Sequence, residues 1–540
     1  MKDISSTGSF INFYLNNYIY VDKTQYIRDL IKLERVFISR PRRFGKSLTL
    51  DTIATLFETG VEPYFKGTWI YDKWTEPTYP VLRLNFLDLD KYSLEHFKQK
   101  LNAIISSFAR DINVKNYEEK VEPEDTIYFL LDELRKEKRQ IVILIDEYDC
   151  QMTANINNET LYKQFQEKIK SFYATIKNKW PIKFLGITGV TRLKDVEIFS
   201  IGSDINDITN DSVYSQMIGF TRDEIKKYYI DYLTLAASYE NKCRVEEVTD
   251  TQIESMLDMM AQNYDGYCFD EFYKKKVFST WSVNKFFQSV VSNKFVYFGE
   301  YWYDNGGLPS ILVNYLKTHE LNIFEYLDKD KFLKVSSDDF KNPTALTTIN
   351  QNVLMCQTGY LTLRSDLNKT STVALGIPNG EIYKALNRLL ANNIFKGNTD
   401  ITDDYGRSLL EVGTVDDIIN LFNSALNSVS YDNYPIVSES SVQNMLKLYL
   451  LGAHQKVLSE VHEAKGRADL VVNTDNRRIV FEFKYAKNET EAKSKLLDAV
   501  EQIKTRDYGN IVPKKTELLR IAAVFNADPK VRAFTEYQKV

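Results

Sequence analysis

Apolar residues in the first 220 positions occur in short, nearly continuous runs separated by longer amphipathic stretches. Such runs are typical of strands in a parallel sheet that is covered on both faces. Four are predicted to be strands, at 36–39 (VFIS), 81–86 (VLRLNF), 141–145 (IVILI) and 184–188 (FLGIT). Three stretches with helical periodicity would connect them, at 47–58, 94–110 and 160–177. The pattern predicts an α/β fold with several βαβ units.

The pattern changes twice further along the chain. From about 220 to 430 the helical period dominates, with turn signals at 264–267, 305–308 and 377–380. Strands return after about 431, at 456–460, 468–472, 478–484 and 518–524, with helices at 440–451 and 491–505. We therefore predict three parts, which are an α/β domain over 1–220, a helical lid and middle region over 221–430, and a smaller α/β domain over 431–540.

Composition narrows the class of protein. A chain of 540 residues is too long for one ordinary core, and 44% hydrophobic with 26% charged residues indicates a soluble globular protein. Because 69 Lys and Arg stand against 74 Asp and Glu, any nucleic-acid binding needs a local basic groove. No long apolar run and no signal peptide are seen, so we expect no membrane contact and a cytoplasmic location. The cysteines form no CxxC pair, which argues against a zinc site or a disulfide framework, at Cys150, Cys243, Cys268 and Cys356.

The first candidate site follows the first predicted strand. A strand, a tight loop and a helix start form a cradle for phosphate, because backbone N–H groups and the helix dipole point at the anion. Lys46 would reach the terminal phosphates and Ser47 would bind Mg²⁺. The usual pattern opens with Gly, where this chain has Arg40, so a basic loop that caps an ordinary helix is the simpler interpretation. The candidate nucleotide-binding residues are Arg40, Pro41, Arg42, Arg43, Phe44, Gly45, Lys46, Ser47 and Leu48.

A second motif supports the nucleotide interpretation. The apolar run at 141–145 ends in two acids, Asp146 and Glu147. A carboxylate at a strand tip can hold Mg²⁺, and the adjacent one can polarise the attacking water. We assign Asp146 to the metal and Glu147 to the water. Either motif alone has a structural explanation, but together they predict an ATP site.

The strand at 184–188 is expected to lie between the two strands that carry these motifs, at 36–39 and 141–145, as in an ATPase of this kind. Thr188 or Thr191 at its tip is a candidate to orient the water. Arg192 would contact the γ-phosphate or its surroundings, or else be a solvent-exposed residue in a turn. Arg42 and Arg43 would contact phosphate or act across a subunit boundary, and the sequence leaves both alternatives open.

A second candidate site lies near the C-terminus. In Glu482-Phe-Lys484 the outer side chains point to one face of a strand, because side chains alternate. With Asp469 on a neighbouring strand, two carboxylates would converge on a divalent metal beside Lys484, a set that can activate water for attack on phosphorus. A charge pair on an exposed strand is the simpler interpretation, but hydrophobic neighbours on both sides favour a buried, functional set.

Three further residues could complete this site. Glu439 opens the preceding helix and would be an additional metal ligand. Gln502 and Tyr508, on and after the following helix, would position either Lys484 or a DNA backbone.

These residues together resemble the bacterial AAA-ATPase-like proteins that carry a C-terminal PD-(D/E)XK nuclease domain. The resemblance covers essentially the whole chain and rests on motifs at 20–24 (YVDKT), 40–47 (RPRRFGKS), 146–149 (DEYD), 188–190 (TGV), 264–267 (YDGY), 357–361 (QTGYL) and 466–469 (GRAD). It implies a P-loop NTPase core of the additional-strand type, a helical lid and middle region, and a metal-dependent nuclease fold. Arg40 is ordinary within this family. One departure is that 441–444 (SVQN) replaces a more usual Tyr-His pair after Glu439.

The predicted function is ATP hydrolysis coupled to a metal-dependent nuclease that processes DNA or serves in defence. A signalling switch whose C-terminal domain binds without cutting is one alternative, and an ATPase that remodels DNA is another. The expected ligands are ATP and Mg²⁺, with Mn²⁺ possible at the nuclease site. The expected partners are nucleotide and DNA, and a homo-oligomer is left open. The motifs at 264–267 and 281–282 are interpreted as packing, as are the aromatic residues at 301–303, for which base stacking is the alternative.

Overall fold

The computed structural model describes residues 1–540 except 178, 194–204, 303–309, 317–322, 344, 396–403, 454, 464–465 and 510–515. The chain forms two compact units. The first unit comprises Met1–His319 and Phe332–Ile382, and the second comprises Glu320–Lys331 and Tyr383–Val540. The three-part division made from the sequence stays a prediction.

A five-stranded sheet in the first unit has the order β2-β3-β4-β1-β5, and its neighbours pair in parallel. The four predicted strands are confirmed. As predicted, the strand at 182–189 (β4) lies between β3 and β1. A short fifth strand beside β1 was not predicted, since it has no apolar run. The strands are β1 (Arg35–Ser39), β2 (Val81–Asn85), β3 (Ile141–Asp146), β4 (Ile182–Gly189) and β5 (Asn206–Asp207).

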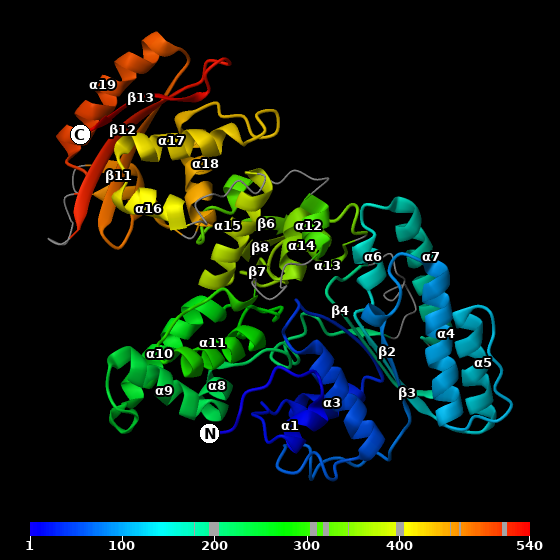
Figure 1. Cartoon of the computed structure of the whole chain (residues 1–540). Coiled ribbons are helices and arrows are strands. Elements are labelled where there is room, and N and C mark those ends of the chain that lie inside the picture. The colour runs from blue at the N-terminus through cyan, green and yellow to red at the C-terminus, as the bar shows by residue number, and fades with distance from the viewer. Residues whose placement is uncertain are drawn as a thin grey trace. The chain divides into compact units, whose positions relative to one another are not determined.

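The predicted crossover helices are also present, as α3 (Lys46–Thr59), α4 (Leu94–Asp111) and α7 (Glu159–Ile176). α4 begins where the Ser93 side chain accepts from the His96 N–H, and α7 begins at the equivalent cap, Asn158. A further helix, α5 (Pro123–Lys136), packs with α4 and α7 in one group (Figure 1). Two short helices, α1 (Phe10–Leu15) and α2 (Thr24–Ile31), precede β1, and α6 (Cys150–Ala154) follows β3.

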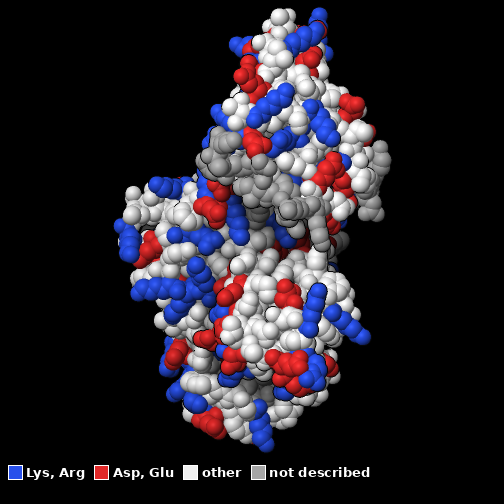
Figure 2. Space-filling view, turned by 90° about the vertical axis from the view of Figure 1, so that its left-hand side faces the viewer, with Lys and Arg blue, Asp and Glu red and all other residues white. Residues whose placement is uncertain are grey.

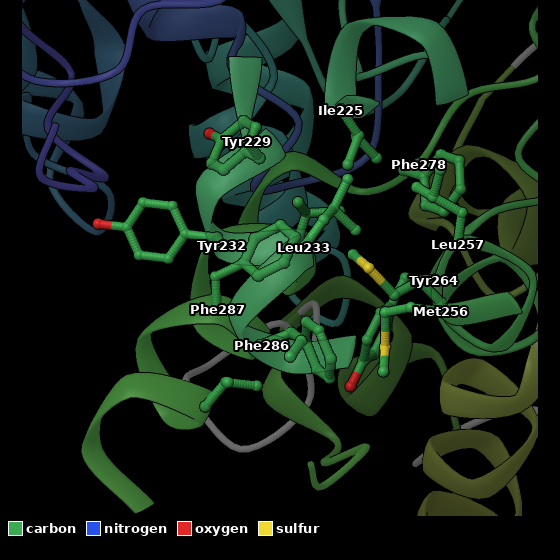
Figure 3. Packing of buried hydrophobic residues seen from close by; sticks show 14 of the residues in the cluster. Ile225, Tyr229, Tyr232, Leu233, Met256, Leu257, Tyr264, Phe278, Phe286 and Phe287 are labelled. Atoms are coloured by element: carbon green, nitrogen blue, oxygen red, sulfur yellow. The ribbon is translucent and has the colours of Figure 1, made fainter. Parts of the chain in front are cut away.

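A helical group follows the sheet along the chain. Tyr229, Leu233, Met256, Phe286 and Phe287 are buried members of its apolar cluster, and Figure 3 shows these side chains turned toward one another. Two helices begin with capping boxes, at Thr221 and Thr249. The helices are α8 (Arg222–Tyr228), α9 (Ile230–Asn241), α10 (Asp250–Tyr264) and α11 (Thr280–Asn293).

The middle region is mainly helical, as predicted, but it also contains a small antiparallel sheet in the order β6-β8-β7. The sequence did not indicate this sheet, because its strands are too short to show a clear period. The turn signal at 305–308 lies outside the described residues. The elements are α12 (Ser310–Leu316), β6 (Leu333–Ser336), α13 (Ser337–Lys341), α14 (Gln351–Thr358), β7 (Thr362–Leu363) and β8 (Thr372–Gly376).

The second unit contains a mixed sheet in the order β13-β12-β11-β10-β9. β11 and β12 pair in parallel, and the other neighbours are antiparallel. The four predicted strands and both predicted helices are confirmed, whereas β13 was not predicted. The strands are β9 (Lys456–Glu463), β10 (Gly466–Asn473), β11 (Arg477–Ala486), β12 (Glu517–Asn526) and β13 (Ala533–Lys539).

Helices cover this sheet (Figure 1). Apolar residues of α19 (Glu489–Arg506) pack on β11 and β12 through Val480, Ala499, Ile503 and Ala522. Phe422 of α17 (Val415–Asn427) packs on Phe481, whose neighbour in sequence, Val480, faces α19, so α17 covers the opposite face. The remaining helices are α15 (Gly380–Ile394), α16 (Asp404–Val412) and α18 (Glu439–Gly452).

Surface charge shows no dominance of one sign on the face in Figure 2, where Lys and Arg are interspersed with Asp and Glu. This agrees with the net charge of −5. Among the helices that the structure describes, none combines the length and the apolar character needed to cross a bilayer.

Candidate functional site

The loop between β1 and α3 has the shape of an anion cradle. Gly45 has φ +105° and immediately precedes the first residue of α3, a conformation that favours glycine. Lys46 is buried, and its Nζ donates to the carbonyl oxygens of Arg40 (3.1 Å) and Pro41 (3.3 Å). The loop therefore folds around the ammonium group, with the start of α3 directed at the space it encloses.

Two acids at the tip of β3 face this loop. The Ser47 hydroxyl donates to Asp146 Oδ2 at 2.5 Å, and Lys46 Nζ lies 3.6 Å from Glu147 Oε1. Thr188 on β4 donates to the other oxygen of Asp146. Parallel strands end at one edge of a sheet, so β3 and β4 bring these side chains to the point where β1 enters the loop. The structure thus brings together the residues that the sequence predicts to be opposed.

Glu147 is held in an unusual environment. Its backbone is in the left-handed region, at φ +52°. Burial raises the pKa of its carboxyl group, Asp149 and Asp146 raise it further, and the nearby Lys46 ammonium opposes them. A carboxylate with a raised pKa accepts a proton more readily near neutral pH, which suits a group that polarises water.

A cavity of about 520 Å³ adjoins the loop, within the range of pockets that hold small ligands. One end is formed by the phosphate-loop residues 42–49 and Glu147. The rest is formed by residues that the sequence did not assign to the site, which are 5–8, Phe13, 19–21, Lys23, Ile27, Thr52, Leu87, 217–220, Tyr229, Thr280, Trp281 and Asn284. This part is largely apolar and aromatic, as expected of a surface that receives a nucleoside.

The N-terminal segment is fastened to the helical group beside this cavity. Three side chains of α9 and α11 donate to its backbone carbonyls: Tyr232 to Lys2 (2.9 Å), Asn284 to Ser5 (3.2 Å) and Gln288 to Ile4 (3.2 Å). These are tertiary contacts between segments more than 200 residues apart, so periodicity could not reveal them. The motif at 20–24 is the one sequence motif that bears on this segment, although no role was predicted for it. Its Tyr20, Val21 and Lys23 line the cavity.

Residues 280–281 and Trp302 support the phosphate loop, which is the segment 40–47 that leads from β1 into α3. Residues 281–282 and 301–303 are predicted from the sequence to serve in packing. Trp302 Nε1 donates to the Arg42 carbonyl (3.2 Å), and the Thr280 hydroxyl donates to the Arg43 carbonyl (3.0 Å). The Arg43 guanidinium stacks on Trp281 at 4.0 Å. Trp302 is fully buried, so the packing interpretation is confirmed for it. Tyr303 lies outside the described residues.

Aromatic packing completes this support. Phe44 is buried against Tyr267 and Phe269, with ring centroids 4.7 Å and 5.6 Å away. Tyr267 ends the motif at 264–267, where Gly266 has φ +95° and a Cβ would lie 2.2 Å from the Pro378 carbonyl oxygen. The turn at this motif therefore serves to place an aromatic surface under the phosphate loop.

Replacing Trp302 with phenylalanine is expected to weaken ATP binding about two- to tenfold. The phenyl ring is smaller than the indole and leaves a void at this fully buried site. The hydrogen bond that holds the Arg42 carbonyl is also lost, and a neutral hydrogen bond contributes about 0.5–1.5 kcal/mol. Titration with a fluorescent ATP analogue measures the change. Trp74→Phe is the matched control, because the buried Trp74 indole N–H has no hydrogen-bond partner among the described residues. Equal affinities for the two variants would contradict a supporting role for Trp302.

Thr188 and Thr191, the two candidates to orient the water, have different partners in the structure. Thr188 contacts Asp146, whereas Thr191 donates through N (2.7 Å) and Oγ1 (2.6 Å) to the buried Asp149. Arg192 forms an ion pair with Asp207 on β5 and is not among the residues that line the large cavity. The structure therefore brings Thr188 to the site and directs Arg192 to a neighbouring part of the sheet edge.

Arg40 and Pro41 contribute to the loop through their backbone. The Arg40 side chain is 1% exposed, donates to the carbonyls of Ser39 (2.9 Å) and Thr209 (2.5 Å), and stacks on Phe269 at 4.1 Å. Burial lowers the pKa of its guanidinium to about 9, so it stays charged at neutral pH. The side chain at this position thus anchors the loop from behind, which explains how an arginine can replace the usual glycine.

The second site lies on β10 and β11. Lys484 Nζ is 2.7 Å from Glu482 Oε1, and the Phe483 backbone N–H donates to Asp469 Oδ2 at 2.8 Å. The three charged side chains that were predicted to converge are brought together. Glu482 is 1% exposed, so the pair that it forms with Lys484 is held in a largely apolar surrounding.

An unpaired oxygen marks where a cation would bind. Glu482 Oε2 is buried and has no hydrogen-bond partner among the described residues. Burial raises the pKa of Glu482 to about 7, and the Asp469 charge adds to this, while Lys484 opposes it. Carboxylate oxygens suit Mg²⁺ or Mn²⁺. In the described part of the chain no group of three or more His, Cys, Asp or Glu is placed to hold a metal, so these two carboxylates would need water or backbone oxygens beside them.

Glu439 contacts this cluster from α18. Its Oε1 lies 3.6 Å from Lys484 Nζ. Gln443, within the segment that departs from the family pattern, donates to the Asp469 carbonyl. The segment 441–444, which differs from the family pattern, therefore still provides a polar side chain that supports the site.

Gln502 and Tyr508 form part of a separate network. The buried Tyr508 hydroxyl accepts from Gln502 (3.2 Å) and Arg506 (2.9 Å). Gly466, which opens β10, lies against this network, because a Cβ there would meet Arg506 at 2.5 Å. No contact of Gln502 with Lys484 is seen in the described structure.

Metal binding at Glu482 is expected to depend on pH. The group carries a proton below about pH 7, and a cation binds the ionised form, so affinity should rise up to tenfold per pH unit below 7 and level off above it. Calorimetric titration of Mn²⁺ between pH 5.5 and 8.5 measures the affinity at each pH. Glu482→Gln should remove the part of the affinity that rises with pH. Glu489→Gln, at an exposed carboxylate on α19, is the matched control. A component that is independent of pH between 5.5 and 7 would contradict the raised pKa.

Comparisons with known proteins match the two regions of the chain in which these sites lie. Residues 5–199 match the family described as predicted AAA-ATPase, and residues 437–534 match the PD-(D/E)XK nuclease superfamily. The chain thus combines an AAA-ATPase-like region with a PD-(D/E)XK nuclease superfamily region, and the resemblance seen in the sequence is confirmed.

One relative and two solved structures are similar to the chain. A protein of Azotobacter chroococcum mcd 1, described as an uncharacterized protein in the vnfD 5' region, is 25% identical over 532 residues, which cover 95% of this chain and 94% of that protein. Cdc6p from Pyrobaculum aerophilum matches with 12% identity and a TM-score of 0.26, over 68% of this chain and 93% of that one. Orc1 from Aeropyrum pernix, solved in complex with DNA, matches with 10% identity and a TM-score of 0.26, over 69% and 95%.

Proposed function

We propose that this protein binds and hydrolyses ATP in its first unit and cleaves nucleic acid, with DNA as the substrate, through a metal-dependent site in its second unit. The observation that carries the proposal is that Lys46 lies 3.6 Å from Glu147 and Ser47 donates to Asp146 beside a cavity large enough for a nucleotide. The nuclease half of the proposal is supported by the buried cluster of Asp469, Glu482 and Lys484.

Each residue of the nucleotide site has a role in the proposal. Lys46, held by the Arg40 and Pro41 carbonyls, uses its remaining N–H to contact the terminal phosphates, and the N–H groups at the start of α3 bind the others. Arg43 is a phosphate contact within the same chain, since its Nη1 is buried without a hydrogen-bond partner among the described residues and it lines the cavity. Glu147 accepts a proton from the attacking water, and Thr188 orients Asp146.

Ser47 and Asp146 are the residues that would hold Mg²⁺, and the hydrogen bond that joins them would open to admit the ion. A hydroxyl and a carboxylate bonded at 2.5 Å are hard oxygen donors of the kind that this ion prefers. When bound, the ion neutralises charge that develops on the phosphates. The protein supplies the fixed positions of the two oxygens, because one lies on the first turn of α3 and the other on a strand tip.

The second site fits a divalent cation on the evidence of the unpaired Glu482 Oε2. Asp469 and Glu482 would hold the ion together with water or backbone oxygens, while Glu439 stays beside Lys484 and is not grouped with them. The ion supplies an activated water and charge neutralisation at phosphorus. Lys484 holds its proton next to Glu482 and stabilises negative charge on the substrate phosphate.

One observation favours a second function. Lys484 is already paired with Glu482, and no third protein carboxylate in the described residues completes a metal set. A site of this kind would bind nucleic acid in response to nucleotide without cutting it. The protein would then be a nucleotide-dependent switch rather than a nuclease.

A single set of incubations tests the proposal. Purified full-length protein is mixed with defined circular and linear DNA and with RNA of matched sequence, with and without ATP, and with Mg²⁺ or Mn²⁺. We expect ATP hydrolysis and cation-dependent DNA cleavage that changes with nucleotide. ATP hydrolysis with DNA retained but uncut would establish the switch instead, and absence of ATP hydrolysis would overturn the proposal.

A further inference from the structure

A second cavity lies within the second unit, apart from the carboxylate cluster. Its volume is about 190 Å³, below the roughly 300–1,000 Å³ of pockets for drug-sized ligands. That size suits one planar ring system rather than a whole nucleotide. Its walls come from the end of α17, the chain that leads to α18, and the turn between β12 and β13.

The lining combines an apolar floor with polar and aromatic walls. Leu426, Ile436 and Phe525 are buried and form the floor, while Tyr431 and Tyr434 line the side. Asn427 adds a carboxamide to the same cavity. Apolar and aromatic surfaces receive the faces of a planar ring, and an amide can bond to its polar edge.

Arg532 adds a charged donor that is held in place. Its guanidinium lies 3.4 Å from the centroid of the Tyr431 ring, and its Nε is buried without a hydrogen-bond partner among the described residues. Its backbone is fixed in the turn, because the Arg532 N–H donates to the Asp528 carbonyl at 3.0 Å. A donor that is positioned but unsatisfied at a cavity indicates a ligand with acceptor atoms.

The cavity is at the same end of the sheet as the carboxylates. Phe525 pairs with Tyr485, the residue after Lys484, and the Ala527 N–H donates to the Ala486 carbonyl at 2.8 Å. Since side chains alternate along a strand, the cavity and Lys484 lie on opposite faces of the sheet. Ile436, on the cavity floor, is three residues before Glu439. The cavity and the carboxylates therefore lie near the same end of the sheet, on its two faces.

We propose that this cavity receives one unstacked nucleobase of a single-stranded part of the substrate, with Arg532 and Asn427 bonding to its edge. The proposal rests on the proposed nuclease function. An inorganic anion would not need the apolar floor, and an aliphatic side chain would not need a guanidinium and an amide. Guanine is the base best matched, because its O6 and N7 are the usual acceptors for arginine.

The test uses full-length protein that carries Glu482→Gln, so that bound DNA is not cut. A single-stranded oligonucleotide with guanine at one position in a thymine background is titrated by fluorescence anisotropy. Tyr431→Ala and Arg532→Gln are each expected to weaken binding about tenfold, the scale of one stacked base. Tyr431→Phe is the matched control, because it keeps the ring under the guanidinium and should change affinity less than twofold. Tyr431 is 39% exposed, so its replacement should not prevent folding.

The outcomes separate this inference from the function on which it rests. If the wild-type protein cuts DNA and all three variants bind like their parent, the nucleobase site is wrong and the nuclease stands. If the protein neither binds nor cuts DNA, the proposed function fails. Guanosine is then titrated by NMR in the presence of excess ADP, which occupies the first unit. Binding that is lost in Tyr431→Ala would support the cavity, and no binding would overturn it.

Discussion

Replacing Lys46 with alanine is expected to lower ATP turnover at least about 100-fold and to abolish measurable ATP binding. The Lys46 ammonium is buried, is held by two loop carbonyls, and lies 3.6 Å from Glu147, so it is preorganised at the place where terminal phosphates would lie. Removing one preorganised donor to developing charge typically costs about 10²–10³ in rate. Phosphate release and binding of a fluorescent ATP analogue measure both effects.

The control for this prediction is Lys163→Ala. Lys163 is exposed on α7 and pairs with Glu159, so its loss should leave turnover unchanged. Removing Lys46 also leaves Glu147 without its cationic neighbour, and thermal melting checks that both variants fold. Wild-type turnover in a folded Lys46→Ala protein would show that the loop does not bind the triphosphate.

Replacing Lys484 with methionine is expected to reduce DNA cleavage about 10³-fold or more while DNA binding persists. Methionine keeps most of the buried stem but removes the charge that lies 2.7 Å from Glu482. The same change should raise the pKa of Glu482 further. In the wild-type protein the Lys484 charge opposes the effect of burial, and the variant lacks that charge. The variant thus loses both a phosphate contact and an ionised metal ligand, which places its effect at the upper end for an active-site charge.

Cleavage of labelled linear DNA at several Mn²⁺ concentrations measures this loss. Lys493→Met is the matched control, since Lys493 is exposed on α19 and pairs with Glu489. Cleavage that survives equally in Lys484→Met and Glu482→Gln would come from a contaminating nuclease and would contradict the assignment. Loss of binding together with cleavage would indicate that Lys484 serves mainly to hold the substrate.

The two variants also separate the two sites. Lys46→Ala should leave the cation-dependent cleavage that occurs without ATP, whereas Lys484→Met should leave ATP hydrolysis unchanged. If nucleotide controls the nuclease, the difference in cleavage with and without ATP should vanish in Lys46→Ala. Reciprocal loss in both variants would instead indicate a single shared requirement, such as folding.

Local patterns in the sequence predict four strands of each five-stranded sheet and the short motifs from which both candidate sites are built. Each of these depends on short-range chemistry. A strand must be apolar when both faces are covered, and a phosphate loop must place Gly45 and Lys46 at a helix start. Two acids at the tip of β3, or Glu482 and Lys484 two apart on β11, are likewise local patterns. Features that depend only on residues close together in the chain can therefore be predicted from the sequence.

Tertiary structure alone decided which other segments meet at these sites. The cavity beside Lys46 is completed by Ser5, Phe220 and Asn284, and the loop is held by Trp302. These residues lie up to 297 positions apart in the chain. It also decided that the Arg40 side chain faces inward and that Arg192 pairs with Asp207. Such contacts depend on how packed elements present their side chains, and the same residues would fit many other arrangements equally well. Their positions are therefore set by packing of the whole unit and leave no period or motif in the sequence.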